Sequence, residues 1–196
     1  MAELIIRRAK RNEAAELAIL DNIAGHGISQ WFWQRAVDNG EAEDAYDWGR
    51  SRFAGHDVFG WRNAWVATED DFIVGSVTAY RMPKDDGEAA DIKRNAPAFA
   101  PVFELFDEAA GSWFIDSMGV YREFRGRGVG RKLFTHAMKQ GKEKGGGTAM
   151  LVCEDTNLAA VALYASGGFK TVGERPYIDF GNNRKVNKWL LMAADL

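Results

Sequence analysis

The chain has 196 residues, of which 46% are hydrophobic and 27% charged, a composition typical of a globular protein that can bury a substantial core. Its net charge of -3 argues against a nucleic-acid partner, and no apolar run approaches the roughly 20 residues that a membrane-spanning helix needs. A single cysteine excludes an internal disulfide, and the N-terminus becomes charged too early for a signal peptide, so we expect a cytoplasmic protein.

The spacing of apolar residues in the N-terminal half predicts several short elements. In chain order these are a strand at 4–7, a helix at 11–23 capped by Asn12, a break at 25–27, an aromatic segment at 28–37, a polar helix at 41–53, and strands at 64–67 and 72–80. The acidic residues at 68–71 predict a turn, so the last two strands should pair antiparallel.

The segment 83–111 is the least regular part of the chain. It combines charged residues, three prolines and a short amphipathic stretch at 102–109. Long irregular segments in compact domains are usually functional or mobile. We expect an inserted loop that carries a helix, within a single domain covering residues 1–196.

The C-terminal half alternates strands and helices. The expected elements are a strand at 113–120, a helix at 129–144, a continuous apolar strand at 149–153, a helix at 157–166, and strands at 169–175 and 186–192. A strand, a helix and a strand in succession form a right-handed crossover, so the first two of these strands should lie parallel. The chain therefore predicts an α/β protein with a mixed sheet of about seven strands and helices on both faces.

A glycine-rich turn joins the strand at 113–120 to the following helix. Glycines let the backbone approach a ligand closely, and the first N–H groups of a helix attract an anion. The turn therefore predicts a site for a phosphate or pyrophosphate, surrounded by arginines. Its residues are Arg125, Gly126, Arg127, Gly128, Val129, Gly130 and Arg131.

Two common phosphate-binding patterns do not fit this turn. The dinucleotide pattern G-x-G-x-x-G places its third glycine on Arg131 or Leu133, depending on the register. The P-loop pattern needs a second glycine where Arg131 stands. Nucleotide-binding proteins of these two classes are therefore disfavoured.

What the turn does match is the form Q/R-x-x-G-x-G/A. It resembles the acetyl-CoA motif of the GNAT superfamily of acyl-CoA-dependent N-acyltransferases. A second motif of that family is matched by the strand at 151–154, followed by Asn157, Ala160, Leu163, Tyr164, Gly168 and Phe169. The resemblance covers residues 113–169 and implies a GNAT-like fold whose central parallel strands splay to hold acetyl-CoA.

The resemblance also implies an activity and its residues. The implied reaction moves the acetyl group of acetyl-CoA to a primary amine in a ternary complex, without a metal. Cofactor contacts are implied for Met118, Gly119, Val120, the turn residues 125–131 and Asn157. Tyr164 is expected near the sulfur, where a tyrosine hydroxyl could protonate the leaving thiolate, although it could also be a packed core aromatic.

Deprotonation of the amine is less well specified by the sequence. Asp116 is our candidate base or water-positioning residue, and a structural hydrogen-bond acceptor is an equally good interpretation. In this family the amine can also lose its proton through waters. A backbone N–H near 118–120 could stabilise the thioester oxyanion if the strand splays there. Cys153 lies in an apolar strand and is expected to be a buried thiol rather than a nucleophile.

The acceptor is expected to be a small-molecule amine, and its identity stays open. The aromatic residues of 28–37 either overlie the acceptor site or pack in the core, and the segment 83–111 is expected to border that site. The acidic residues at 41–47 either favour a cationic amine or form a solvated helix face. A homodimer is possible, and a non-catalytic acyl-CoA-binding or sensory module is the alternative function.

Overall fold

The computed structural model of the protein describes residues 3–84, 92 and 94–196. Two compact units are present, one formed by Met1–Tyr80 and Ile115–Gln140 and the other by Arg81–Phe114 and Gly141–Leu196. Because the boundary falls inside β4 (Trp113–Val120) and α6 (Val129–Glu143), both elements contribute to both units. That residues 1–196 form a single domain stays a prediction.

The strands confirm the predicted mixed sheet. In the first unit β1 (Ile5–Arg8), β2 (Ala64–Glu69), β3 (Phe72–Arg81) and β4 follow in that order, and the first three pair antiparallel. The second unit continues from the start of β4 through β5 (Thr148–Glu154) and β7 (Lys188–Asp195) to β6 (Lys170–Pro176).

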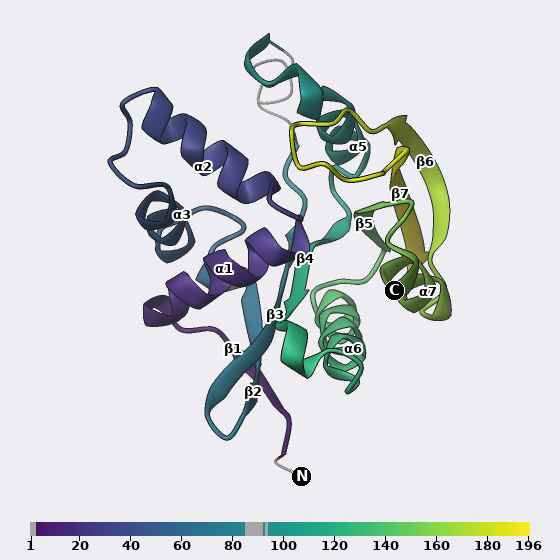
Figure 1. The fold of residues 1–196 in the computed structure, drawn as a ribbon. Helices are drawn as coiled ribbons and strands as arrows, with labels where there is room; N and C mark the ends of the chain where they lie inside the picture. The colour runs from purple at the N-terminus through teal and green to yellow at the C-terminus, as the bar shows by residue number, and fades with distance from the viewer. Residues whose placement is uncertain (1–2, 85–91, 93) are drawn as a thin grey trace. The chain divides into compact units, whose positions relative to one another are not determined.

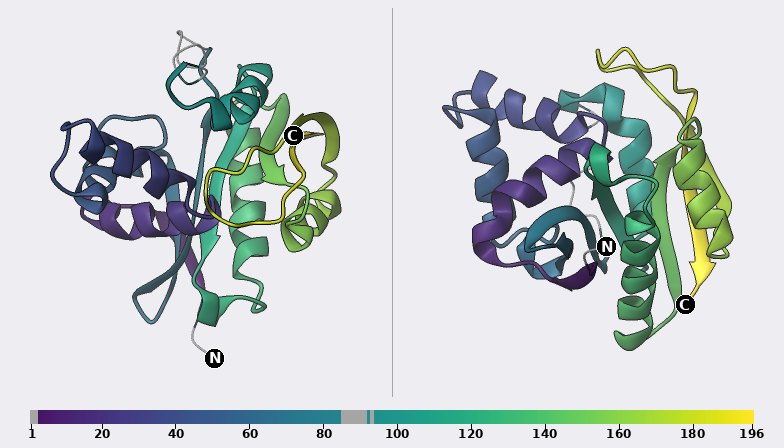
Figure 2. Two further views of the ribbon diagram at one scale, coloured as in Figure 1. Left: turned by 45° about the horizontal axis from the view of Figure 1, so that its top comes forward. Right: turned by 60° about the horizontal axis from the view of Figure 1, so that its bottom comes forward.

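The β4–β5 pair is parallel, as the crossover predicts. Its ladder joins Trp113 to Ala149 and Phe114 to Met150, all within the second unit. Strand β7 runs antiparallel to both β5 and β6, and Figure 2 shows it (yellow) beside β5. The strands β4 and β5 are expected to separate after this ladder, in their later residues, and this splay stays a prediction.

Helices cover both faces of the sheet in the first unit. On one face α1 (Ala14–Ala24), α2 (Ile28–Asp38) and α3 (Ala45–Ala54) form a core with Ala64 and Val66 of β2 (Figure 1). Because side chains alternate along a strand, Trp65 points to the other face, where its ring lies 5.5 Å from that of His136 on α6. The sequence predicts only an aromatic segment at 28–37. In the structure this segment is the helix α2.

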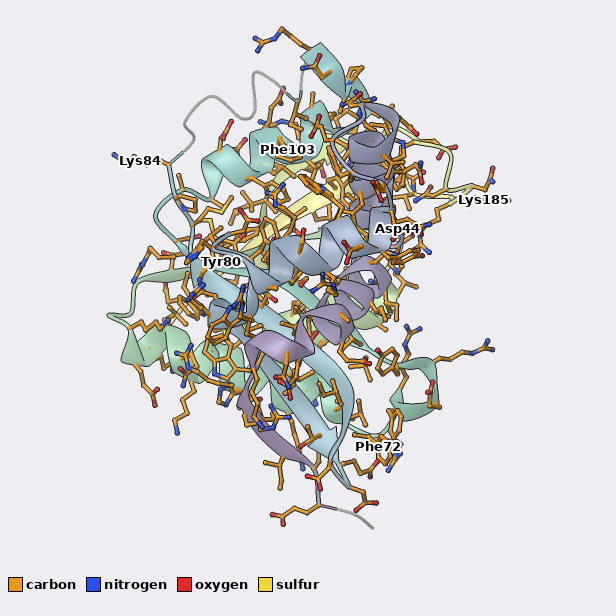
Figure 3. All side chains as sticks on the ribbon, turned by 90° about the vertical axis from the view of Figure 1, so that its left-hand side faces the viewer. Asp44, Phe72, Tyr80, Lys84, Phe103 and Lys185 are labelled. Carbon is orange, nitrogen blue, oxygen red and sulfur yellow. The ribbon has the colours of Figure 1, made fainter. Side chains whose placement is uncertain are left out.

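The β2–β3 connection is the tight acidic turn that the sequence predicts. Asp70 and Asp71 have φ of 49° and 66°. Two consecutive residues with positive φ form the hairpin turn whose twist matches that of the flanking strands. Phe72, at the start of β3, lies beside this turn (Figure 3).

The start of α1 differs from the prediction, because Asn12 does not cap it. Residues 11–13 form a 3-10 turn, and α1 begins at Ala14. The carboxylate of Glu13 accepts a hydrogen bond from the Lys10 N–H at 2.7 Å and is paired with Arg7 at 2.6 Å. The Glu13 carboxylate thus satisfies the N–H at the start of the 3-10 turn, whereas its side chain makes no capping hydrogen bond to α1.

The second unit contains α5 (Ala100–Glu108) and α7 (Leu158–Ser166). The expected amphipathic stretch at 102–109 is confirmed as α5, which buries Val102 and Leu105 at helical spacing. Arg175 of β6 pairs with Glu104 and Glu108 of this helix. The rest of the predicted insertion falls partly on residues 85–91 and 93, which lie outside the described residues.

A close contact between α1 and β4 fixes the geometry of the first unit. A Cβ atom built on Gly119 would lie 2.2 Å from the carbonyl oxygen of Leu20, far inside van der Waals contact. Both partners are backbone, so neither can rotate away. The absence of a side chain at Gly119 is therefore what allows α1 to pack directly on the strand.

We predict that Gly119→Ala destabilises the protein by about 1–3 kcal/mol, because the added methyl group must push α1 away from β4. Gly25→Ala is the matched control, since a Cβ there meets its nearest atoms at 3.6 Å, an ordinary contact. Urea unfolding of both variants measures the difference. Equal midpoints for the two variants would show that α1 adjusts without cost.

Candidate active site

The structure distributes the predicted site residues between the two units. The first unit contains Asp116, the strand end at 118–120 and the whole glycine turn at 125–131, whereas the second contains Asn157 and Tyr164. The approach of Tyr164 and Asn157 to the turn stays a prediction.

The turn between β4 and α6 has the backbone conformation that its glycines predict. Gly126 and Gly128 have φ of 75° and 82°, and a Cβ atom built on either would meet nothing within 4 Å. The space where a side chain would stand is therefore open at both positions. Glycine is required there because of the positive φ and not because a side chain would clash. The first helical hydrogen bond joins the Lys132 N–H to the Gly128 carbonyl at 3.1 Å, which leaves the N–H groups of Val129 and Gly130 outside the helix's own ladder.

Two arginine side chains hold this turn in shape. Arg125 turns back and donates from Nε to the Val120 carbonyl at 2.9 Å. Arg127 pairs with Glu69 at 2.5 Å and lies over the Phe124 ring, 5.2 Å from its centroid. The turn is thus fastened to the end of β4 and to the β2–β3 hairpin.

Asp116 belongs to a half-buried polar cluster in the same unit. Its carboxylate accepts a hydrogen bond from the hydroxyl of Tyr80, a residue near the end of β3 remote from Phe72 (Figure 3). It also experiences the charge of Asp21 on α1. Asp21 in turn accepts hydrogen bonds from Ser29 at 2.5 Å and from Ser117. Four elements, α1, α2, β3 and β4, therefore meet at two carboxylates.

The environment shifts the protonation of both carboxyl groups. Burial, together with the like charge of Asp21, raises the pKa of Asp116 to about 7, and the Tyr80 hydrogen bond opposes this only in part. Burial also raises the pKa of Asp21, against the two serine hydrogen bonds that favour its charged form. Close like charges titrate as a pair, so the ionisation of each carboxyl group depends on that of the other.

Sequence reasoning did not find Asp21 and Tyr80. Asp21 is one turn after the buried Leu17 on an amphipathic helix, and this spacing is the one available signal that its carboxylate faces the protein interior. Tyr80 looks in the sequence like an ordinary aromatic residue of a strand. Their convergence on Asp116 depends on long-range strand and helix packing.

In the second unit, Asn157 and Tyr164 are on the face of α7 that is turned inward. Asn157 caps this helix, and its side-chain oxygen accepts a hydrogen bond from the Ala160 N–H at 3.3 Å. Tyr164 is buried, and its ring centroid lies 6.3 Å from that of Phe169. Burial raises the pKa of the Tyr164 hydroxyl above its usual range, so the hydroxyl stays protonated at neutral pH.

Cys153 is the buried strand thiol that the sequence predicts. It is a free cysteine with 8% of its surface exposed. Burial raises its pKa to about 12, with smaller contributions from Glu154 and Asp155. A thiol that stays protonated is a poor nucleophile.

The aromatic and acidic residues of the N-terminal half have mainly structural contacts. Trp33 belongs to the core between α1, α3 and β2. Asp44 caps α3 by accepting from the Asp47 N–H at 2.8 Å, and Asp47 pairs with Arg50 on the exposed surface. These contacts favour core packing for the aromatic residues over a position above the acceptor site. For the acidic residues they favour a solvated helix face over binding of a cationic amine.

Within the ranges 3–84 and 94–196 and at residue 92, no group of three or more His, Cys, Asp or Glu side chains is placed to hold a metal ion. Of the helices in the described part of the chain, none has the length and apolar character required to cross a bilayer.

The raised pKa of Asp116 predicts a pH dependence of stability. The folded state keeps this proton up to about pH 7, whereas an ordinary aspartate releases it near 3.8. Between these values the folded state binds more protons than the unfolded state, so stability should decrease as the pH rises. We predict that Asp116→Asn flattens this decrease. Urea unfolding at intervals from pH 4 to 8 measures it, and identical slopes for variant and wild type would contradict the shift.

Comparison with known proteins connects this geometry to a family. A solved polyamine N-acetyltransferase of Drosophila melanogaster, which forms N-acetylagmatine, has 16% identity and a TM-score of 0.65, with 99% of this chain and 100% of that chain covered. The yncA protein of Salmonella typhimurium, solved with its cofactor acetyl-CoA, has 19% identity and a TM-score of 0.61, with coverage of 100% and 95%.

The ribosomal-protein-S18-alanine N-acetyltransferase of Escherichia coli has 15% identity and a TM-score of 0.61, with 98% of this chain and 94% of that chain covered. At such identities these structures show a shared fold alone. No curated protein matches the chain. The model of the Acetyltransferase (GNAT) family, however, matches residues 25–169. Since this match spans well over half of the chain, the protein belongs to the GNAT acetyltransferase family, whose acyl donor is acetyl-CoA.

Proposed function

We propose that the protein transfers the acetyl group of acetyl-CoA to the primary amine of a small molecule, with Asp116 as the base. The observation that carries this proposal is the Asp116 cluster. A half-buried carboxyl group with a pKa of about 7 is located on the strand that leads directly into the glycine turn. General bases work best when their pKa lies near the operating pH, and an ordinary aspartate is too weak a base to compete for an ammonium proton.

The residues of the β4–α6 turn fit the pyrophosphate of acetyl-CoA. The space in front of Gly126 and Gly128 is open, and the N–H groups of Val129 and Gly130 begin a helix whose dipole favours an anion. These residues, together with the arginines of the turn, would hold the phosphates. When bound, acetyl-CoA supplies a thioester carbonyl as the acyl donor.

The residues of the chain account for the proton transfers. Asp116 accepts a proton from the acceptor ammonium, which frees the nitrogen lone pair for attack as the N–C bond forms and the C–S bond breaks. Tyr164, protonated at neutral pH, donates its hydroxyl proton to the leaving sulfur. Asp116 then releases its proton to water and Tyr164 regains one, so the two groups return to their starting states.

An amine acceptor is supported by the comparisons. The Drosophila neighbour is a polyamine N-acetyltransferase, and the Escherichia coli neighbour acetylates an alanine of a ribosomal protein. A small-molecule acceptor suits a carboxylate cluster that is half-buried between helices and strands, where an extended peptide has less access than a short amine.

Glycine conformation at the turn gives a test of cofactor binding. We predict that Gly128→Ala weakens acetyl-CoA binding about tenfold, because alanine disfavours the positive φ that aims the backbone at the phosphates. Gly147→Ala is the matched control. Gly147 has φ of 95°, and a Cβ there also meets nothing within 4 Å, but it lies in the α6–β5 connection. Calorimetry with acetyl-CoA measures both; equal affinities would exclude the turn as the phosphate site.

Turnover tests the function itself. We predict that the protein releases free thiol from acetyl-CoA when offered at least one member of a panel comprising a diamine, an aminoglycoside, an amino-acid amide and a peptide with N-terminal alanine. Asp116→Asn should lower kcat/KM about 100-fold or more, and Tyr164→Phe should lower kcat while the affinity for acetyl-CoA is kept. Tight binding of acetyl-CoA without turnover of any amine would favour the non-catalytic sensory module instead.

A further inference from the structure

Asp21 is a half-buried titratable group that the proposed mechanism does not use. Its carboxylate is held in one orientation by hydroxyls from two other elements, Ser29 of α2 at 2.5 Å and Ser117 of β4. Its own element, α1, packs backbone-to-backbone on β4 through Leu20, the preceding residue. A carboxylate fixed from three sides cannot move away from a neighbouring charge.

The neighbouring charge is that of Asp116. Among the described residues, the groups that act on Asp116 are Asp21 from α1 and Tyr80 from β3. The Tyr80 hydrogen bond favours the ionised form of Asp116, and the charge of Asp21 opposes it. Because Asp21 accepts two hydroxyl hydrogen bonds and Asp116 accepts one, hydrogen bonding favours the ionised form of Asp21 more than that of Asp116.

We propose that Asp21 is a positioning residue of the proposed reaction: its negative charge, fixed by Ser29 and Ser117, makes Asp116 able to take a proton from an acceptor ammonium. This inference rests on the proposed function. It assigns the two carboxylates different tasks, since Asp21 stays ionised and bound to the serines while Asp116 exchanges its proton. Asp21 need not touch the acceptor.

The experiment compares wild type, Asp21→Asn and Asp21→Glu by two independent measurements. Carbon NMR of labelled aspartate carboxyl groups follows the titration of Asp116 without any substrate, with Asp116→Asn to assign the signal. The pH profile of kcat/KM is recorded with the amine of the panel that reacts fastest. Asp38→Asn, which removes one charge from the exposed end of α2 where Asp38 binds Gln34, is the matched control.

We expect Asp21→Asn to move the Asp116 titration and the acidic limb of kcat/KM downward together by about one pH unit or more. The variant should therefore be faster than wild type near pH 6 and slower above pH 8, where the weaker base limits the rate. Asp21→Glu, which keeps the charge, should restore most of the wild-type profile, and Asp38→Asn should leave it unchanged.

Other outcomes overturn the inference in distinguishable ways. If the Asp116 titration does not move in Asp21→Asn, the inference is overturned. The proposed function stays intact in that case as long as the protein turns over an amine. If the Asp116 titration moves in Asp21→Asn but the acidic limb of kcat/KM does not, the inference is overturned and Asp116 is not the base. If Asp21→Asn does not fold, the wild-type NMR titration still decides, because an Asp116 signal that titrates near 4 in a single step contradicts the pair.

Discussion

The carbonyl oxygen of Leu20 lies against the bare Cα of Gly119, and the geometry of the candidate site depends on this contact between α1 and β4. Since Asp21 follows Leu20 and Ser117 shares a strand face with Gly119, the same contact brings a helix carboxylate to a strand hydroxyl. A larger residue at Gly119 would separate the two elements. The hydrogen bond between Ser117 and Asp21 thus depends on close packing of the α1 backbone on β4.

Burying two like charges has an energetic cost, and the structure limits it in two ways. Hydroxyl donors from three elements satisfy the carboxylate oxygens, because Ser29, Ser117 and Tyr80 each contribute one hydrogen bond. Protonation of one carboxyl group removes most of the remaining repulsion. The arrangement leaves a carboxyl group that can exchange a proton in the physiological range.

The glycine turn and the Asp21 carboxylate are each held in place by contacts from neighbouring elements. Arg125 fastens the turn to the Val120 carbonyl, and Arg127 fastens it to Glu69 of the hairpin, as the serines fasten Asp21. Groups that are fixed before a ligand arrives lose little conformational entropy when it binds. The surface ion pair of Arg127 adds little stability by itself, so its main effect is to hold the turn in place.

The sequence by itself determined the family, the mixed sheet and the glycine turn, because these depend on local patterns. Residues 113–131 combine an apolar strand, glycines at alternate positions and an amphipathic helix, and each of these is encoded within a few residues. Asp116 could be singled out because it is a charged residue within an apolar strand. Asn12 was assigned wrongly as a cap because residues 11–13 form a 3-10 turn before α1, in which the Glu13 carboxylate binds Arg7 and the Lys10 N–H.

Only the tertiary structure decided which groups surround Asp116. Asp21 and Tyr80 are separated from it by 95 and 36 positions in the numbering, and no local pattern connects them. Their meeting requires α1 to pack on β4 and β3 to pair beside it, which are long-range events. A pKa near neutrality is a property of that assembled environment, since burial and a neighbouring charge produce it and neither exists in the isolated strand.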